Sequence, residues 1–366
     1  MDATTASAMV FEGVDQPLQP RQIPLPELDS QEVLVRVLCC TICGSDVHTF
    51  EGHRATPLPT ILGHEILGEV VALGGEGEVL GITGAPIEVG QRVTWSVVGH
   101  CGSCFYCQQE LPQKCEQLFK YGHRALQEDH QLSGGLADYC HLKPGTRLLT
   151  VPDDLPTRVA TPANCATATI AGAFRVAGDV RDAHVLILGA GMLGLTAAAM
   201  ASSRGAASVV VTDISAERLK RAERFGAHKT VLMGEGGDGL PDAVQGLTSG
   251  RGMDVVIDVC GVAEAVQQGL HSLRIGGVLV LLGSVFPGPP LSLDLENVVR
   301  RMLTIRGVHN YAPEDLVAAV EFLHQVHEVY PFAELVTDTY PLDEVAEAFR
   351  AAADPGSLRV AITPQA

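Results

Sequence analysis

Four cysteines crowd one short stretch of the chain with the spacing of metal ligands. They are Cys101, Cys104, Cys107 and Cys115. Four soft thiolates suit a tetrahedral zinc ion, and a site closed by four protein ligands has no open position for a substrate. Cysteines that only pack in a hydrophobic core would not need this regular spacing. We therefore expect a structural zinc site here.

A second set of possible metal ligands is spread along the sequence. Cys43 follows an apolar run, His64 and Glu65 come next, and Cys165 lies much further along the chain. A lone buried cysteine is usually core filling, and a lone histidine is usually a satisfied polar residue. Spacing by itself therefore leaves this second site open.

A glycine-rich motif follows an apolar run and precedes an alanine-rich segment. It consists of Gly189, Ala190, Gly191, Met192, Leu193 and Gly194. The first glycine permits a tight turn, the second lets the backbone approach a pyrophosphate, and the third allows close helix packing. The N-terminus of the following helix would supply N–H donors to the phosphates. This context predicts a dinucleotide site, and a purely structural glycine turn is the alternative.

An aspartate ends the next apolar run, as the ribose-binding carboxylate of a dinucleotide site does. Asp213 could accept hydrogen bonds from both adenosine ribose hydroxyls. It therefore favours NAD over NADP, because a 2′-phosphate would meet a like charge. Arg218 could soften that repulsion, and an ordinary strand-end turn residue is the alternative for Asp213.

The elements that must position these residues fall into two groups. The first 150 residues hold short β-type runs among glycines and prolines, which indicates an irregular β domain. From about Thr161, strand-like and helical segments alternate, which predicts a parallel sheet. Its candidate strands are continuous apolar runs, typical of strands buried on both faces, at Val185–Leu188, Val209–Val211, Val255–Val259 and Val278–Leu282.

Composition restricts the class of protein. With 366 residues and 46% hydrophobic composition, the chain can bury more than one core. Its formal charge of −18 disfavours nucleic acid and anionic membranes as partners. The apolar stretch Val185–Ala201 is interrupted by three glycines, which a strand, turn and helix explain better than a membrane span. The first ten residues do not read as a secretory signal, so we expect a cytoplasmic protein with reduced cysteines.

Taken in order, these motifs resemble the medium-chain zinc alcohol dehydrogenases over the whole chain. The matching segments are Cys43-Gly-Ser-Asp-Val-His48, Gly63-His64-Glu65, the four-cysteine loop and the glycine motif. The resemblance implies a zinc-dependent oxidoreductase that transfers a hydride between an alcohol and NAD. We accordingly predict an α/β fold, with a doubly wound parallel Rossmann sheet for NAD at 167–300. An irregular β-rich, GroES-like catalytic zinc domain is expected at 1–166 and 301–366.

The resemblance also implies roles for individual residues. Cys43, His64 and Cys165 would be the catalytic zinc ligands, with the fourth position left to water or substrate. The third ligand can be a glutamate in this family, but the stretch 162–169 offers Cys165 and no carboxylate. Glu65 would lie near the zinc, either behind its ligands or as a transient ligand, and Asp46 would orient the imidazole of His64. Ordinary structural polar residues are the alternative for both.

Two further residues are implied to move the alcohol proton. Ser45 would accept the proton and pass it through the cofactor ribose toward His48. The imidazole can exchange protons near neutral pH, and a surface histidine without a relay role is the alternative. The resemblance also suggests a homodimer or homotetramer.

The substrate is less sharply indicated. Lys120-Tyr-Gly-His123 and Gly307-Val-His-Asn-Tyr311 resemble alcohol dehydrogenases associated with phosphonate catabolism, which would make the substrate an anionic alcohol or aldehyde. Candidate contacts are His53, Arg54, Lys120, His123, Arg124 and His309. Scattered solvated side chains are the alternative for this set.

Three alternative functions differ in substrate or chemistry. The chain could be a polyol or simple-alcohol dehydrogenase of the same family. A zinc-free quinone or enoyl reductase would not need the metal-ligating residues. A nucleotide-binding regulatory protein would keep the fold without turnover.

Overall fold

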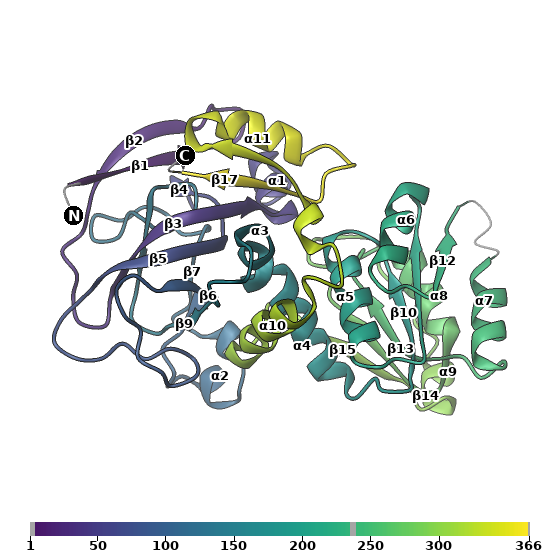
Figure 1. The fold of residues 1–366 in the computed structure, drawn as a ribbon. Coiled ribbons are helices and arrows are strands. Elements are labelled where there is room, and N and C mark those ends of the chain that lie inside the picture. The colour runs from purple at the N-terminus through teal and green to yellow at the C-terminus, as the bar shows by residue number, and fades with distance from the viewer. Residues whose placement is uncertain (1–3, 235–238, 365–366) are drawn as a thin grey trace. The chain divides into compact units, whose positions relative to one another are not determined.

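The computed structural model describes residues 4–234 and 239–364 and contains two compact units. The first unit comprises Met1–Ala168, Ala312–His327 and Phe332–Ala366, and the second comprises Thr169–Tyr311 and Glu328–Pro331. The C-terminal segment thus returns to the unit that the N-terminal segment builds (Figure 1).

The first unit is rich in short strands. These are β1 Thr5–Phe11, β2 Gln19–Pro24, β3 Val33–Ile42, β4 Thr60–Ile61, β5 Glu65–Leu73, β6 Arg92–Gly99, β7 Phe119–Lys120, β8 Tyr139–Leu142, β9 Thr146–Thr150, β16 Val336–Pro341 and β17 Arg359–Thr363. The larger sheet follows the path β16-β17-β3-β5-β6-β7, with β8 on β3 and β9 on β6, and the smaller sheet has the order β2-β1-β4. All these pairs are antiparallel except β16 with β17. The prediction of an irregular β-rich domain is confirmed.

Helices of the first unit are short apart from one. They are α1 Gly44–Phe50, α2 Phe105–Gln108, α3 Thr157–Ala160, α10 Pro313–Val326 and α11 Val345–Ala352, with 3₁₀ turns at Pro112–Lys114, Thr161–Asn164, Phe332–Leu335 and Leu342–Glu344. Phe349 of α11 stacks on Phe50 at the end of α1, with ring centroids 4.5 Å apart. The C-terminal segment therefore helps to fix the helix that carries Ser45 and His48.

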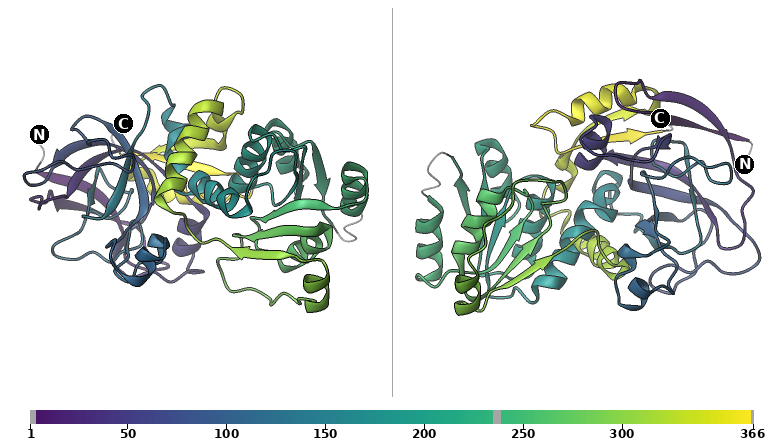
Figure 2. Two further views of the ribbon diagram at one scale, coloured as in Figure 1. Left: turned by 90° about the horizontal axis from the view of Figure 1, so that it is seen from below. Right: turned by 180° about the vertical axis from the view of Figure 1, so that it is seen from behind.

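The second unit is built on parallel strands joined by helices (Figure 2). Its strands are β10 His184–Leu188, β11 Ser208–Asp213, β12 Lys229–Leu232, β13 Met253–Asp258, β14 Leu273–Leu281 and β15 Thr304–Gly307, and its helices are α5 Met192–Ser203, α6 Ala216–Arg224, α7 Gly239–Thr248, α8 Ala263–Ser272 and α9 Leu295–Arg300. The strand order is β12-β11-β10-β13-β14-β15. The strands β11 and β12 are added on one side of β10, and β13, β14 and β15 are added on the other. This is the doubly wound Rossmann arrangement that the sequence predicts.

Burial on both faces of β10 explains its unbroken apolar run. Leu186 and Leu188 share one buried cluster with Val244 of α7 and Leu270 of α8. Val185 and Ile187 are just as buried and, because side chains alternate along a strand, point to the opposite face. Helices therefore cover the central strands from both sides, as continuous apolar strands indicate.

The unit boundaries differ slightly from the sequence prediction. The first boundary falls within helix α4 Ala166–Ala177, next to the expected residue 166, but the second falls at 311/312 rather than 300/301. Residues 301–311 stay with the second unit because they contain β15, which pairs in parallel with β14.

In the part of the chain that the structure describes, no helix is long and apolar enough to cross a membrane.

Candidate metal centres and cofactor site

Four residues from three separate segments bring metal-binding atoms together in the first unit. The ligand atoms of Cys43, His64, Glu65 and Cys165 all lie within 4.8 Å of one another. Cys43 lies between β3 and α1, and Glu65 opens β5. Cys165 follows the 3₁₀ turn Thr161–Asn164. A metal ion bound here would be held by residues that are far apart in the sequence.

The imidazole of His64 is oriented by Asp46. Nδ1 of His64 lies 3.1 Å from Oδ1 of Asp46, which leaves Nε2 as the nitrogen for a metal. The same carboxylate accepts from the backbone N–H of Cys43 at 2.9 Å, so it fixes two candidate ligands at once. Burial opposes charge on the imidazole, yet Asp46 and Cys43 raise the pKa of His64 to about 10. The surroundings of His64 thus favour a positive charge, which is what a metal cation would bring.

A hydrogen bond joins the two thiols of the site. The hydrogen bond from Cys165 holds the pKa of Cys43 well below its usual range, against the effect of burial and with help from Arg359 and His64. The same bond raises the pKa of Cys165. Cys43 is therefore the more acidic of the two thiols, and the thiolate is the form that binds a metal.

A buried arginine behind the site was not singled out from the sequence. Nε and Nη2 of Arg359, on β17, donate to the two carboxylate oxygens of Glu65 at 2.7 and 2.9 Å. Nη2 also lies 3.5 Å from Sγ of Cys43, and Thr41 donates to Glu65 at 2.6 Å. The only signal in the sequence was an arginine that opens an apolar C-terminal run.

Asn164 was also missed, although it precedes Cys165. Its side-chain amide donates to the carbonyl oxygens of His64 at 3.0 Å and Trp95 at 2.9 Å. Its Oδ1 accepts from the backbone N–H of Ile66 at 3.3 Å. The residue is fully buried. One side chain therefore ties the backbone before Cys165 to the backbone around His64.

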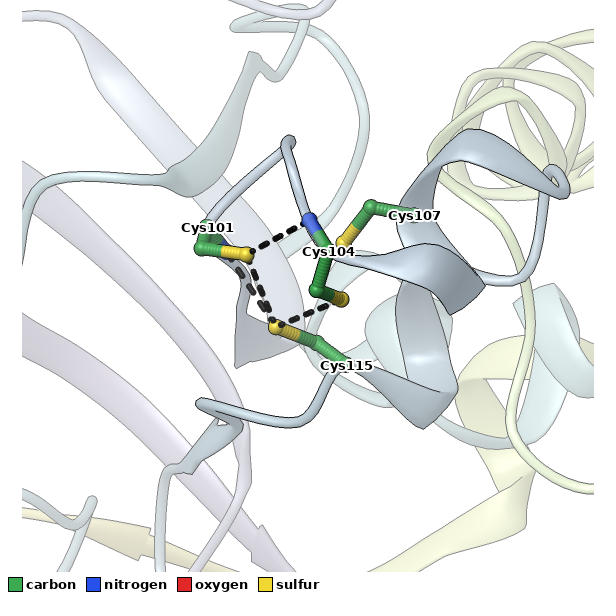
Figure 3. Close-up of side chains that lie close together, drawn as sticks. All are labelled: Cys101, Cys104, Cys107 and Cys115. Atoms are coloured by element: carbon green, nitrogen blue, oxygen red, sulfur yellow. Dashed lines mark hydrogen bonds between the residues drawn. The ribbon is translucent and has the colours of Figure 1, made fainter.

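The four-cysteine loop folds into a second cluster, drawn in Figure 3. Its sulfur atoms lie within 4.8 Å of one another, with Cys115 Sγ 3.5 Å from Cys101 Sγ and 3.9 Å from Cys104 Sγ. Tetrahedral zinc with Zn–S bonds of about 2.3 Å requires sulfur atoms about 3.8 Å apart. The backbone N–H groups of residues 103 and 104 point at Sγ of Cys101, as they would to support a thiolate ligand. The cluster fits a closed zinc site.

The predicted relay residues both lie on α1. Ser45 and His48 are three residues apart, which places them on the same side of the helix. Both side chains are half-buried. The helix begins directly after Cys43, so the candidate relay starts next to a candidate metal ligand.

Three of the six predicted substrate contacts converge beside the His64 site. Nη1 of Arg54 lies 3.4 Å from Nε2 of His123, and the His123 ring centroid lies 5.1 Å from that of His64. Burial and the neighbouring Arg54 lower the pKa of Lys120 to about 8, although the thiols of Cys165 and Cys43 oppose the shift. Lys120 therefore interacts electrostatically with both Arg54 and the thiols of the metal site.

Of the other three predicted contacts, His53 and Arg124 contact other residues of the first unit. Nδ1 of His53 lies 3.4 Å from a carboxylate oxygen of Glu51. Arg124 lies over the ring of Phe119, with its Cζ 5.3 Å from the ring centroid. His309 lies in the second unit.

The glycine motif of the second unit forms the turn between β10 and α5. A Cβ on Gly194 would lie 1.9 Å from the carbonyl oxygen of Gly189, so only glycine fits there. A Cβ on Gly191 would meet no protein atom within 4 Å. Met192 and Leu193 form the first turn of α5, whose N–H groups lie at its N-terminus. The turn has the shape of a pyrophosphate cradle.

Asp213 at the end of β11 is tied to this turn. Its Oδ2 accepts from the backbone N–H of Ala190 at 2.7 Å, and its Oδ1 accepts from the backbone N–H of Ser215 at 2.8 Å. Arg218 lies in the first turn of α6, where its N–H donates to Ser215. Each carboxylate oxygen can accept more than one bond, so Asp213 can serve both the turn and a ribose.

Comparison with known proteins decides the family. Residues 29–153 match the alcohol dehydrogenase GroES-like domain, and residues 193–325 match the zinc-binding dehydrogenase domain. An L-threonine 3-dehydrogenase from Shewanella pealeana is 30% identical over 90% of this chain and 91% of its own length. The chain belongs to the medium-chain zinc-dependent alcohol dehydrogenase family.

Other members of this family show the range of its substrates and cofactors. A sorbitol dehydrogenase from Halalkalibacterium halodurans is 30% identical, with 93% of this chain and 94% of that protein aligned. An alcohol dehydrogenase from Thermotoga maritima has the same fold, with a TM-score of 0.93, 30% identity and 99% and 100% of the two chains covered. A zinc-binding dehydrogenase from Sinorhizobium meliloti, solved with NADP, has a TM-score of 0.84, 26% identity and coverage of 99% and 100%.

Proposed function

We propose that the protein is a zinc-containing, NAD-linked dehydrogenase that interconverts an alcohol and its aldehyde or ketone. The observation that carries this proposal is the convergence of Cys43, His64 and Cys165, with Glu65 among them. Two thiolates and an imidazole make a three-ligand zinc site of the catalytic kind. Bound zinc would supply Lewis acidity toward the substrate oxygen there, and bound NAD would supply the hydride acceptor.

The chain's own residues set up the reaction around that site. Asp46 holds the imidazole of His64 in one orientation, and Arg359 balances the charge of Glu65. Ser45 would take the proton of the alcohol, and His48 would exchange it with solvent. In this proposal the first unit performs catalysis and the second binds NAD, in a homodimer or homotetramer.

Asp213 supports NAD as the cofactor. Its carboxylate ends β11, where the adenosine ribose of a Rossmann cofactor is bound. The related dehydrogenase from Sinorhizobium meliloti was solved with NADP, and kinetics with both cofactors test the preference of this chain for NAD.

The convergence of Arg54, Lys120 and His123 supports an anionic substrate, such as a phosphonate-bearing alcohol. Because arginine can only donate, the contact with Arg54 makes Nε2 of His123 an acceptor and leaves the ring proton on Nδ1. That Nδ1 is buried without a partner among the described residues. Arg54 and Lys120 form no ion pair with a carboxylate in the described part of the chain. Two cations and one N–H donor would thus meet the oxyanion of a substrate.

A polyol is the second candidate substrate. It is favoured by the 30% identity to the sorbitol dehydrogenase, which acts on a substrate with several hydroxyl groups and no charge. The donors of Arg54, Lys120 and His123 could bond hydroxyl groups as well. An uncharged substrate would leave the two cations uncompensated, which is why we place it second.

A substrate panel followed by NADH absorbance tests the proposed function. It should contain a hydroxyalkyl phosphonate, a hydroxy acid of equal length, their uncharged analogue and a polyol. We expect the two anionic alcohols to be oxidised with higher kcat/KM than the uncharged analogue, with the advantage shrinking at high ionic strength. Lys120→Ala should remove most of that advantage, whereas Lys229→Ala, at an exposed position in the second unit, should leave it unchanged. Equal efficiency for charged and uncharged substrates would refute the anionic substrate, and turnover with none of them would refute the dehydrogenase.

A further inference from the structure

Three side chains with metal-binding atoms gather at the end of α1, outside both cysteine-containing centres. They are His48, Glu51 and His53, and one ligand atom from each lies within 4.8 Å of the other two. Nδ1 of His53 lies 3.4 Å from Oε2 of Glu51. The ring centroids of His48 and His53 are 5.8 Å apart. The cluster is therefore a local feature of one helix end and the turn after it.

Backbone hydrogen bonds hold this turn in place. The N–H of Glu51 donates to the carbonyl of Val47 at 2.9 Å, and the N–H of Arg54 donates to the carbonyl of His48 at 3.1 Å. The second bond folds the chain back over the helix end, which brings His53 next to His48. The side chains of His53 and Glu51 are accessible, with 65% and 41% exposed, and His48 is half-buried. A fixed backbone thus holds three possible ligands together at the edge of the first unit.

Two imidazoles and one carboxylate are a ligand set that zinc accepts. Zn–N and Zn–O bonds of about 2.0–2.2 Å in a tetrahedral site place ligand atoms about 3.3–3.6 Å apart. Glu51 and His53 already have this separation, and the ligand nitrogen of His48 lies within 4.8 Å of both, so zinc binding would draw it into the set. We propose that His48, Glu51 and His53 form a third zinc site, separate from the Cys43 and Cys101 centres, and that zinc bound there inhibits the enzyme.

Inhibition follows from the position of His48. A zinc ion takes the lone pair of an imidazole nitrogen, and that nitrogen can then no longer accept a proton. If His48 exchanges the alcohol proton with solvent, zinc bound at the third site stops that exchange. This part of the inference rests on the proposed function, whereas zinc binding by the cluster does not.

Zinc titration of the purified holoenzyme tests the proposal. Calorimetry should show one further equivalent of Zn²⁺ per chain, more weakly bound than the zinc already present. The initial rate of alcohol oxidation, measured in zinc-buffered solutions, should fall as this equivalent binds. Glu51→Gln should keep the uninhibited rate but raise the half-inhibiting zinc concentration at least tenfold. Glu76→Gln removes the same charge from an exposed loop position of the first unit and should change neither value.

The outcomes separate this inference from the proposed function. No further equivalent of zinc, or equal inhibition of Glu51→Gln and Glu76→Gln, would overturn the third site. A third equivalent that binds without slowing turnover would overturn its inhibitory role. A third equivalent that is lost in Glu51→Gln, in a protein that oxidises no alcohol, would support the zinc site while refuting the dehydrogenase.

Discussion

Arg359, on the last strand of the chain, forms a bidentate ion pair with Glu65, at 2.7 and 2.9 Å, in the interior of the first unit. Both side chains are buried, and the guanidinium also reaches Sγ of Cys43 at 3.5 Å. The pair therefore sets the charge behind the candidate zinc site. It also makes the C-terminal strand part of that site.

Removal of the arginine should destabilise the first unit. Arg359→Met leaves Glu65 as an unpaired buried carboxylate, which costs about 3–5 kcal/mol in comparable cases. The double variant Arg359→Met/Glu65→Leu should recover much of that loss, because no buried charge remains. Chemical denaturation in zinc-saturated buffer measures both. Equal losses in the single and double variants would show that packing, rather than the ion pair, carries the effect.

Asn164 should control how long the catalytic zinc stays bound. Asn164→Ala removes the bonds to the carbonyls of His64 and Trp95 and so frees the backbone before Cys165. We expect zinc transfer from this site to a chromogenic chelator to become at least tenfold faster, with zinc at the four-cysteine site released as in the native protein. Asn297→Ala, on α9 of the second unit, is the matched control. Unchanged release kinetics in Asn164→Ala would rule out a positioning role.

Asp213 should decide the choice between NAD and NADP. Asp213→Gly removes a carboxylate acceptor of the ribose and its repulsion of a 2′-phosphate. A hydrogen bond to a charged group contributes about 1.5–3 kcal/mol, so the ratio of kcat/KM for NAD over NADP should fall by about 10- to 150-fold. The variant also loses the bond to Ala190, so efficiency with NAD should drop in absolute terms. A native preference for NADP would contradict this interpretation of Asp213.

Local patterns predicted most of the second unit. The apolar run at Val185–Leu188 and the glycines after it specify a strand, a turn and a helix within some twenty residues, and all three are present. The four-cysteine loop is equally local. In both cases the residues that lie together in the fold are also close in the sequence, so the local motif was enough to predict the local structure.

The remaining part of the site depends on contacts between distant segments. Arg359 reaches Glu65 because β17 pairs with β3, which in turn pairs with β5. No local sequence pattern predicts these pairings. Sequence proximity also does not set side-chain direction. His123 turns toward His64, whereas Arg124, its neighbour in the chain, turns onto Phe119. These directions required the structure.

The zinc content of the purified protein and of Cys165→Ala tests the central claim most directly. The account predicts close to two zinc ions per chain in the native protein, and about one in Cys165→Ala, with the fold kept and alcohol oxidation lost. A matched Cys140→Ala variant, at a buried thiol outside both clusters, should retain both ions and its activity. An active native protein without zinc, or a Cys165→Ala variant with unchanged zinc and turnover, would contradict the account.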